Sequence, residues 1–249
     1  MPAISMSRVV IVVPCFNEEH RLPADGVLEL VARDDVGALL VDDGSTDGTR
    51  ARLTEIARRR PDRIDVLGLD RNRGKAEAVR RGLLSAIDRG AAVVGYMDAD
   101  MATPPAEVLR LVARLDASPD VRVVLASRVA VLGARIQRKA HRHYLGRVFA
   151  TGASLALGLP VYDTQCGAKV FRVDDALRRA LAEPFSSRWA FDVELLGRLL
   201  PDSGPHGFIE VPLREWRDPG GSKLSLPAML RAGADLAVIA AKLRARRKP

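Results

Sequence analysis

The sequence predicts an α/β fold in which helices cover both faces of a mostly parallel central sheet. Three observations support this prediction. Short apolar runs that suit buried strands alternate with helical segments through residue 126. Clusters of glycine, proline and acidic residues separate these segments, as expected for the connections of such a sheet. The chain of 249 residues is long enough for one large domain with a substantial core.

The first half is expected to hold five strands and four helices in alternation. Residues 9–13 form an unbroken β-branched run that suits a central parallel strand. Pro61 ends the second helix, and Pro104 lies near the first turn of the fourth. We expect strands at 9–13, 38–41, 64–69, 92–97 and 121–126, and helices at 22–33, 49–60, 75–89 and 104–115.

The pattern changes after Ser127. Residues 135–159 are predicted to be mainly helical, and a polar loop follows at 163–167. Strands are then expected at 168–171 and 208–213, and helices at 174–181, 189–200 and 226–247. No internal repeat or low-complexity linker divides the chain, so we expect one continuous domain.

Lysine and arginine exceed aspartate and glutamate by 8, which favours an anionic partner such as nucleotide phosphates, nucleic acid or an anionic membrane. Cys15 and Cys166 match no metal-binding spacing and suggest no disulfide framework, so a reducing cytosol is expected. We expect no signal peptide, and no apolar run approaches the ~20 residues of a spanning helix. The composition therefore predicts a soluble or peripheral protein.

Asp98 and Asp100 follow the fourth predicted strand, one residue apart. Ligands of an open α/β sheet bind at the carboxyl ends of its strands. Carboxylate oxygens suit a hard divalent ion such as Mg²⁺ or Mn²⁺, which is usually shared with substrate phosphates. Taken alone, the pair could equally be a helix-capping turn before Pro104 and Pro105.

The loops after the other three strands also carry polar residues, and the carboxyl ends of parallel strands meet at one edge. These residues are Pro14, Asn17 and Glu18 after the first strand, Asp42 and Asp43 after the second, and Asn72 and Lys75 after the third. The acidic pair could still be a helix cap, and the lysine a solvated helix start. The chain lacks a dinucleotide fingerprint and a Walker loop, so phosphate charge must be met by a metal and by Lys or Arg. That requirement is typical of a nucleotide-sugar transferase.

Four motifs in this order resemble glycosyltransferase family 2. They are Val12-Val13-Pro14-Cys15-Phe16-Asn17-Glu18-Glu19, Val41-Asp42-Asp43-Gly44-Ser45-Thr46-Asp47-Gly48-Thr49, Asn72-Arg73-Gly74-Lys75 and Asp98-Ala99-Asp100. Three later segments are similar to the dolichyl-phosphate β-glucosyltransferases, and the related polyprenyl-phosphate mannosyltransferases share part of them. These segments are 163–171, 188–196 and 221–223.

The resemblance implies a GT-A fold, Rossmann-like, with a nucleotide-sugar-binding half at 1–128 and an acceptor-binding half at 129–249. Pro14, Asn17 and Glu18 would line the nucleoside pocket, and Asp43 would accept from the base with Asp42 beside it. Lys75 would lie near the base or the diphosphate. Asp98 would lie near the ribose and the metal, and Asp100 would be the principal ligand of Mg²⁺ or Mn²⁺.

For the acceptor side, the resemblance implies a set of phosphate-facing residues, namely Arg128, Gln165, Lys169 and Lys223. Trp189, Phe191 and Asp192 would form the sugar and acceptor side. Asp192 would act as a base or orient the acceptor; the alternative is a buried structural partner for Arg188.

Two segments predict contact with an anionic membrane. The spacing of Arg135, Arg138, Lys139 and Arg142 predicts one basic helix face, which we also expect to bind acceptor phosphate. The final helix has an apolar side that includes Leu236, Ile239 and Leu243, and a basic end, as an interfacial helix would. A helix packed on the core with a solvated tail is the alternative.

Together these features predict an inverting, metal-dependent transfer of glucose from UDP-glucose to a polyprenyl phosphate. The enzyme is expected to be cytoplasmic and peripherally attached to the membrane. The alternatives are a GDP-mannose donor or a soluble acceptor; Ala102, where some mannosyltransferases have a metal-binding Gln, favours glucose. A nucleic-acid partner is not expected, because the converging carboxylates would repel phosphates and no recognised binding motif is present.

Overall fold

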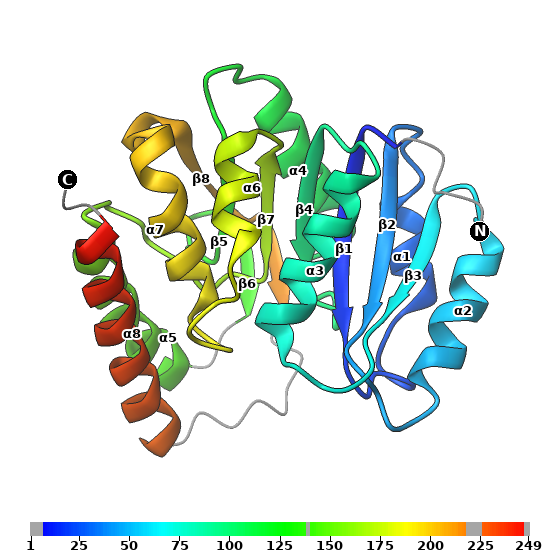
Figure 1. Ribbon diagram of the computed structural model, residues 1–249, viewed down its shortest axis with the longest axis horizontal. Coiled ribbons are helices and arrows are strands. Elements are labelled where there is room, and N and C mark those ends of the chain that lie inside the picture. The colour runs from blue at the N-terminus through cyan, green and yellow to red at the C-terminus, as the bar shows by residue number, and fades with distance from the viewer. Residues whose placement is uncertain (1–6, 138–139, 218–225, 247–249) are drawn as a thin grey trace.

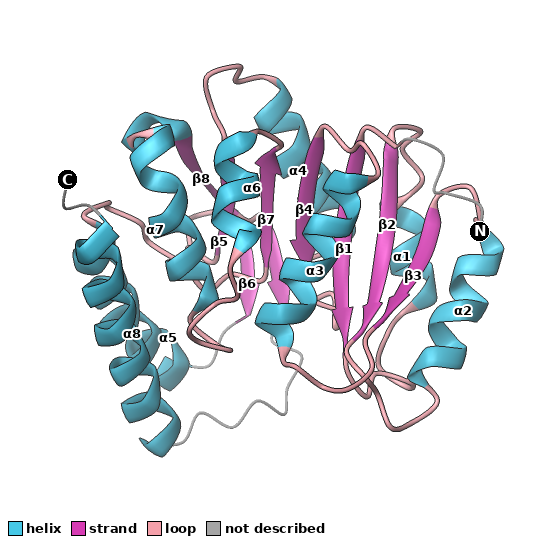
Figure 2. Cartoon of the chain, in the orientation of Figure 1, coloured by secondary structure: helices cyan, strands magenta, loops and turns pink. Residues whose placement is uncertain are grey.

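The computed structural model confirms the predicted α/β class. It describes residues 7–137, 140–217 and 226–246, and within α5 and α8 the side chains are described from 146 and over 232–245. A seven-stranded sheet runs through the middle of the molecule, and helices cover both of its faces (Figures 1 and 2).

Most of the strands and helices occur where the sequence predicts them. The strands are β1 (Val9–Cys15), β2 (Val36–Asp42), β3 (Ile64–Gly68), β4 (Val93–Met97), β5 (Val123–Ser127), β6 (Arg135–Gln137), β7 (Ala168–Arg172), β8 (Phe208–Pro212) and β9 (Glu215–Arg217). The helices are α1 (Ala24–Leu30), α2 (Thr49–Arg59), α3 (Lys75–Asp88), α4 (Pro105–Asp116), α5 (Ala140–Leu157), α6 (Asp175–Ala182), α7 (Phe191–Ser203) and α8 (Leu226–Arg246), with a 3₁₀ turn at Pro205–Gly207.

The strand order β3-β2-β1-β4-β7-β5-β8 places the chemistry of the chain at one edge of the sheet. Cys15 pairs with Asp42, and Asp42 with Gly68, so β1, β2 and β3 end in line with one another. Only β7 runs antiparallel within this sheet, pairing with β4 and β5. The segment before β7 therefore enters the sheet at the edge where the other strands end.

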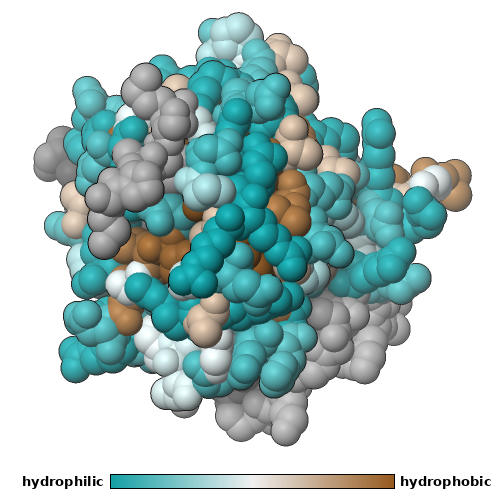
Figure 3. All heavy atoms as spheres, turned by 90° about the vertical axis from the view of Figure 1, so that its right-hand side faces the viewer, coloured by the Kyte–Doolittle hydropathy of each residue, from teal (hydrophilic) through white to brown (hydrophobic). Residues whose placement is uncertain are grey.

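The core has two layers, one on each face of the sheet. Alternate residues of β1 point to opposite faces, as the period of a strand requires. Val10 and Val12 join the layer under α3, α6 and α7, whereas Val9, Ile11 and Val13 join the layer under α1, α2 and α4. Beyond edge strand β3, the side of the molecule around α2 is largely hydrophilic (Figure 3).

The prediction of a helix at 135–159 is wrong at its beginning. Residues 135–137 form β6, which pairs in parallel with β9, and α5 begins only at Ala140. The Arg135 N–H donates to the carbonyl of Arg214 at 2.7 Å, and Ile136 packs against the core while its neighbours are exposed. Arg135 therefore does not share a helix face with Arg142. The short strand β9 was not predicted.

The apolar side of α8 is partly a core face. Ile239 and Leu243 are buried, and the Leu243 side chain packs against Gly197 of α7, leaving no room there for a Cβ atom. For these two residues the prediction of an interfacial face is wrong, because both are buried in the core. The alternative of a helix packed on the core describes this part of α8.

Candidate active site

A cavity of about 320 Å³ opens where β1, β2 and β4 end and α3 begins. Its volume lies at the lower end of the range of small-molecule sites. It is lined by Pro14, Cys15, Phe16, Glu18, Asp43, Asn72, Gly74, Lys75, Ala78, Asp98, Ala99 and Asp100. A wider hollow of about 530 Å³ lies beside α2, but no strand-end residue lines it. The smaller cavity, which gathers all four predicted loops, is therefore the candidate site.

Asp43 joins the end of β2 to the beginning of α3. One carboxylate oxygen accepts the N–H of Arg73 at 2.8 Å, and the other accepts the N–H of Gly74 at 2.7 Å. Gly74 has a φ of 91°, a left-handed conformation that glycine adopts without strain. Burial raises the pKa of Asp43, although these two hydrogen bonds and the charge of Arg188 oppose that rise. The buried carboxylate thus shapes the cavity wall.

Asp98 lies between Lys75 of α3 and the segment that precedes β7. Its carboxylate forms an ion pair with Lys75, the first residue of α3, and its N–H donates to the carbonyl of Gly167 at 3.0 Å. A Cβ atom on Gly167 would collide with the Asp98 carboxylate, so a larger residue at 167 would displace that carboxylate. Desolvation lowers the pKa of Lys75, but the charges of Asp98 and Asp192 outweigh it and raise the pKa overall.

Asp100 occupies a tight turn between β4 and α4. Its carboxylate accepts the N–H of Ala102 at 3.0 Å, and Met101 has a φ of 49°, which is unfavourable for a side chain of that kind. Burial raises the pKa of Asp100, and the neighbouring charge of Asp98 adds to the rise. A bound cation would relieve both effects. Asp100 therefore carries negative charge that no arginine or lysine pairs with directly among the described residues.

Two predicted donor residues hold the loops together and do not line the cavity. Asn17 accepts the N–H of Thr46 at 3.0 Å and adopts a left-handed φ of 54°. Asp42 accepts the N–H of Ser45 at 3.0 Å, which agrees with the alternative of a turn-forming residue. Glu18, by contrast, lines the cavity and forms an ion pair with Arg21 at 2.6 Å.

Lys169 and Asp192 form a buried pair beneath the cavity. The Lys169 side chain is 0% exposed, and its Nζ donates to Asp192 at 2.6 Å and to the carbonyl of Cys166 at 2.8 Å. The hydroxyl of Tyr96 also donates to Asp192. The prediction that Lys169 faces a phosphate is therefore wrong for this structure, because its amine is buried and neutralises Asp192. The partner of Asp192 is also not Arg188.

Arg128 is likewise paired within the protein. Its guanidinium makes two hydrogen bonds to Asp163, at 2.7 and 2.9 Å, and lies over the ring of Trp216. Burial lowers the pKa of Arg128, but Asp163 outweighs burial and raises it overall. In the same loop, the buried Nε2 atom of Gln165 has no hydrogen-bond partner among the described residues. The loop thus presents an amide donor whose hydrogen bond is still to be made.

The other acceptor-side residues are only partly described. Trp189 is 49% exposed and packs edge-on against Phe149 of α5 at a ring distance of 4.9 Å. Arg138 and Lys223 lie outside the described residues, and so does the side chain of Arg142. Both cysteines are free and buried.

Two residues of the site were missed. Phe16 lines the cavity and is 41% exposed, and Tyr96 binds Asp192 from β4. Phe16 directly precedes Asn17, which has a left-handed φ, and asparagine adopts that conformation more readily than most residues. Tyr96 sits in an apolar strand, where a buried hydroxyl needs a partner, and that need was the available signal.

The two aspartates Asp98 and Asp100 fit a divalent ion that is shared with a substrate. No group of three or more His, Cys, Asp or Glu side chains among the described residues could hold a metal by itself. Two carboxylates at the mouth of a cavity are the donor set with which Mg²⁺ or Mn²⁺ binds substrate phosphates. Asp100 has the less engaged carboxylate, since Asp98 is paired with Lys75.

The fold and the position of the cavity define a glycosyltransferase of the GT-A class. The family model of glycosyl transferase family 2 matches residues 10–178, and the chain belongs to this family.

The chain is similar to curated relatives over most of its length. It is 33% identical to the dolichyl-phosphate beta-glucosyltransferase of Drosophila melanogaster, with 96% of this chain and 75% of the relative covered. It is 35% identical to the mouse enzyme of the same name, with 92% and 74% covered. It is also 30% identical to the polyprenol monophosphomannose synthase of Mycolicibacterium smegmatis, with 88% and 81% covered.

Solved structures confirm the fold. Glucosyl-3-phosphoglycerate synthase from Mycobacterium tuberculosis, crystallised with Mn²⁺, UDP and glucosyl-3-phosphoglycerate, superimposes with a TM-score of 0.68 at 23% identity. The match covers 94% of this chain and 80% of that protein. Within the described part of this chain, no helix is both long and apolar enough to cross a bilayer.

Proposed function

We propose that the protein transfers glucose from UDP-glucose to a polyprenyl phosphate, with inversion at the anomeric carbon and with Mg²⁺ or Mn²⁺ as cofactor. The observation that carries the proposal is the cavity at the strand ends, where Asp43, Lys75, Asp98 and Asp100 meet. The glucosyltransferases among the relatives favour this donor and this acceptor.

We assign the donor to residues 1–128 and the acceptor to residues 129–249 of one continuous domain. Pro14, Glu18 and Asp43 would surround the nucleoside, and Lys75 would face the diphosphate. Asn17 and Asp42 would act indirectly, by fixing the loops that carry these residues.

Asp100 would be the principal metal ligand and Asp98 the second. When bound, the ion would neutralise the charge that develops on the departing diphosphate. Lys75 would add a second positive charge beside it. Its ion pair with Asp98 holds the amine at the cavity wall.

In the transfer, a phosphate oxygen of the acceptor forms a bond to the anomeric carbon while the bond from that carbon to the UDP oxygen breaks. The phosphate is already largely anionic at neutral pH, with a second pKa near ~6, so no proton has to be removed from it. Positioning and charge neutralisation therefore matter more than a base. Asp192, which is buried and paired with Lys169, would position the acceptor side of the site.

For the acceptor phosphate we propose Arg128, Gln165 and Lys223, with Trp189 against the sugar or the lipid. Gln165 has a buried amide nitrogen that is unpaired among the described residues, and Trp189 is 49% exposed. Arg128 could turn from Asp163 to a phosphate only by exchanging one charged partner for another.

We propose that α5 and α8 face the cytoplasmic side of a membrane, where the acceptor enters. The two helices pack against each other, and both carry exposed apolar side chains. These are Val148 and Leu155 of α5, at 72% and 76% exposure, and Val238 of α8 at 50%. Basic residues such as Lys242 and Arg244 would add attraction of roughly 1 kcal/mol each at an anionic surface. Flotation with anionic liposomes tests this surface: removal of residues 244–249, which keeps Lys242 and the buried Leu243, should weaken binding more than transfer to a short-chain acceptor.

A mannosyl donor is the second candidate, because the mycobacterial relative is named for a polyprenol-linked mannose. Separate incubations of the protein with radiolabelled UDP-glucose or GDP-mannose, in membrane extracts, distinguish the two. We expect a label that partitions into organic solvent from UDP-glucose only. A lipid product from GDP-mannose alone would reverse the choice of donor, and a water-soluble product would rule out the lipid acceptor.

A further inference from the structure

The loop between α6 and α7, residues 183–190, reaches from the acceptor half to the donor cavity. It descends to the edge where β1 and β2 end and α3 begins (Figure 1). A Cβ atom on Gly74 would lie 3.1 Å from Cδ of Arg188, so the stem of this arginine packs directly on the Gly74 backbone. Gly74 is part of the cavity wall. Next to it, Lys75 lies over the ring of Phe191 at 6.0 Å.

The residues that line the cavity carry an excess of negative charge. The cavity is lined by four carboxylates, those of Glu18, Asp43, Asp98 and Asp100, against the single ammonium group of Lys75. A nucleoside diphosphate brings further negative charge, so the site needs more positive charge than a divalent ion and one lysine supply. Arg188 is exposed, and no described residue forms an ion pair or hydrogen bond with its guanidinium. Its charge nevertheless acts on Asp43, where it opposes the rise in pKa that burial causes.

Helix α8 fixes the loop from the other side. The hydroxyl of Ser187 donates to Asp235 of α8 at 2.5 Å and accepts the N–H of Ala190 at 2.9 Å. The amine of Lys242, also on α8, donates to the hydroxyl of Ser186 at 2.6 Å. The residue before Arg188 is therefore anchored, while its own side chain stays available at the cavity.

We propose that Arg188 binds the diphosphate of the nucleotide donor, reaching over Gly74 from the acceptor half, and that Asp235 positions it through Ser187. This proposal rests on the proposed function, because it needs a nucleoside diphosphate in the cavity. A guanidinium can pair with two phosphate oxygens at once, which an ammonium group cannot do in the same geometry. The contact would join the two halves of the domain when the donor is bound.

The test is calorimetric titration of the full chain with UDP and with uridine, in the presence of Mn²⁺. Arg188→Ala should weaken UDP binding by about tenfold to a hundredfold, the range for a charge-assisted hydrogen bond, and leave uridine binding unchanged. Arg188→Lys should recover part of the loss. Arg179→Ala is the matched control, because Arg179 is an exposed arginine of α6 that pairs with Asp202. Unchanged UDP binding in Arg188→Ala, or an equal loss for uridine, would overturn the proposal.

Asp235→Asn tests the positioning role. It should weaken UDP binding in the same direction by a smaller factor, and the double variant with Arg188→Ala should bind UDP no more weakly than Arg188→Ala alone. Additive losses would overturn the link to α8. If the wild-type protein binds GDP and not UDP, the proposed donor is wrong and the same variants are titrated with GDP. If it binds neither nucleotide, both proposals are overturned.

Discussion

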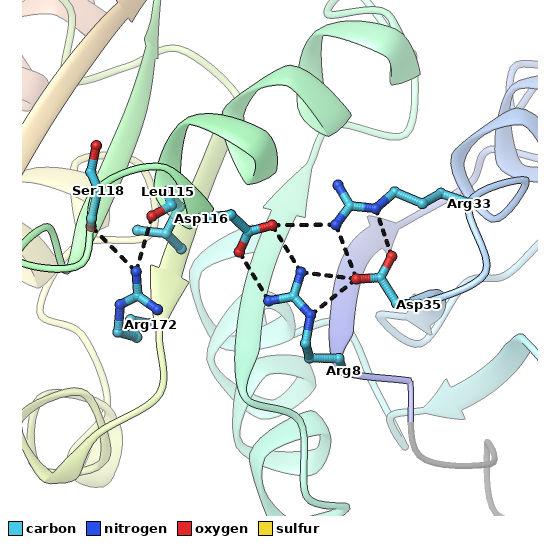
Figure 4. Close-up of polar contacts among 7 residues, drawn as sticks. All are labelled: Arg8, Arg33, Asp35, Leu115, Asp116, Ser118 and Arg172. Carbon is cyan, nitrogen blue, oxygen red and sulfur yellow. Dashed lines mark hydrogen bonds and ion pairs between the residues drawn. The ribbon is translucent and has the colours of Figure 1, made fainter.

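The carboxylates near the two ends of helix α4 differ in charge compensation: Asp116 is paired with arginines, whereas Asp100 is not paired with a basic side chain among the described residues. Asp116, its last residue, accepts hydrogen bonds from Arg8 at 2.9 Å and from Arg33 at 3.3 Å, and both arginines also bind Asp35 (Figure 4). These partners lower the pKa of Asp116 and, against the effect of burial, that of Asp35. Asp100, just before α4, has a pKa raised by burial and by Asp98.

This difference in charge compensation indicates that the edge near Asp116 stabilises the fold, whereas the edge near Asp100 serves binding. At the edge where the strands begin, opposite charges neutralise one another and join β1, β2 and α4. In the same region, Arg172 donates to the carbonyls of Leu115 and Ser118 (Figure 4). At the edge where the strands end, folding leaves negative charge on Asp100 uncompensated, and a bound cation would offset the cost. The comparison predicts that substitutions at the two edges affect different properties.

The largest expected effect is at Asp100. Asp100→Asn keeps an acceptor for the N–H of Ala102 but removes the charge, and we expect transfer to fall by about a thousandfold in kcat/KM. Thermal unfolding should show an unchanged or higher Tm, because the native state disfavours the charged form. A clear loss of Tm, or full activity, would contradict the distinction between the two edges.

Lys169 comes next, as a charge that is neutralised inside the molecule. Lys169→Met removes the partner of the buried Asp192, and we expect a loss of about 3–5 kcal/mol in the free energy of unfolding. Urea titration measures it. If stability is retained and only affinity for the acceptor falls, Lys169 is a phosphate ligand after all, as the sequence first suggested.

A smaller effect is expected at the opposite end of α4. Asp116→Asn should reduce the free energy of unfolding by about 1 kcal/mol, the scale of a partly exposed ion pair, with kcat/KM unchanged. Parallel urea titrations and transfer assays on this variant and on Asp100→Asn give the matched comparison. A loss of activity in Asp116→Asn with unchanged stability would contradict the distinction between the two edges.

The smallest effect is a dependence on pH. The pKa values of Asp35 and Asp116 lie below the ordinary value of 3.8 in the folded state, so their stabilisation is complete above that pH and is lost as the pH falls through the lowered values. The stability difference between wild type and Asp116→Asn should therefore shrink below pH ~4. For Asp100 the sign is reversed: the wild type should gain relative to Asp100→Asn as the pH falls. Urea titrations at neutral and acidic pH decide both signs.

The sequence predicted the fold class and the convergence of the strand-end residues, because both depend on local pattern. Apolar runs and turn formers indicated β1 to β5, and the parallel order then brought Asp43, Lys75, Asp98 and Asp100 to one edge. The strand at 168–171 was predicted and is β7, but its antiparallel direction was not, since a short apolar run does not specify a direction. That direction is what places Gly167 against Asp98.

Side-chain partners were harder to predict than positions. A lysine in a strand can face a ligand or a buried carboxylate, and only the packing of α7 on β7 shows that Lys169 meets Asp192. The contact of Arg188 with Gly74 depends on a loop and a helix that are more than 100 residues apart in sequence. Such pairings follow from topology, and neither residue type nor spacing specifies them.

The most direct test of the different roles of the two sheet edges is a titration of isotope-labelled protein with Mn²⁺ and UDP, followed by NMR. Bound Mn²⁺ broadens nearby amide signals. We expect the signals of Phe16, Ala99 and Gly167 to be lost first, and those of Asp35 and Asp116 to persist. Broadening centred on Asp35 and Asp116, or none at the cavity, would contradict the assignment of the nucleotide and metal to the edge that holds Asp98 and Asp100.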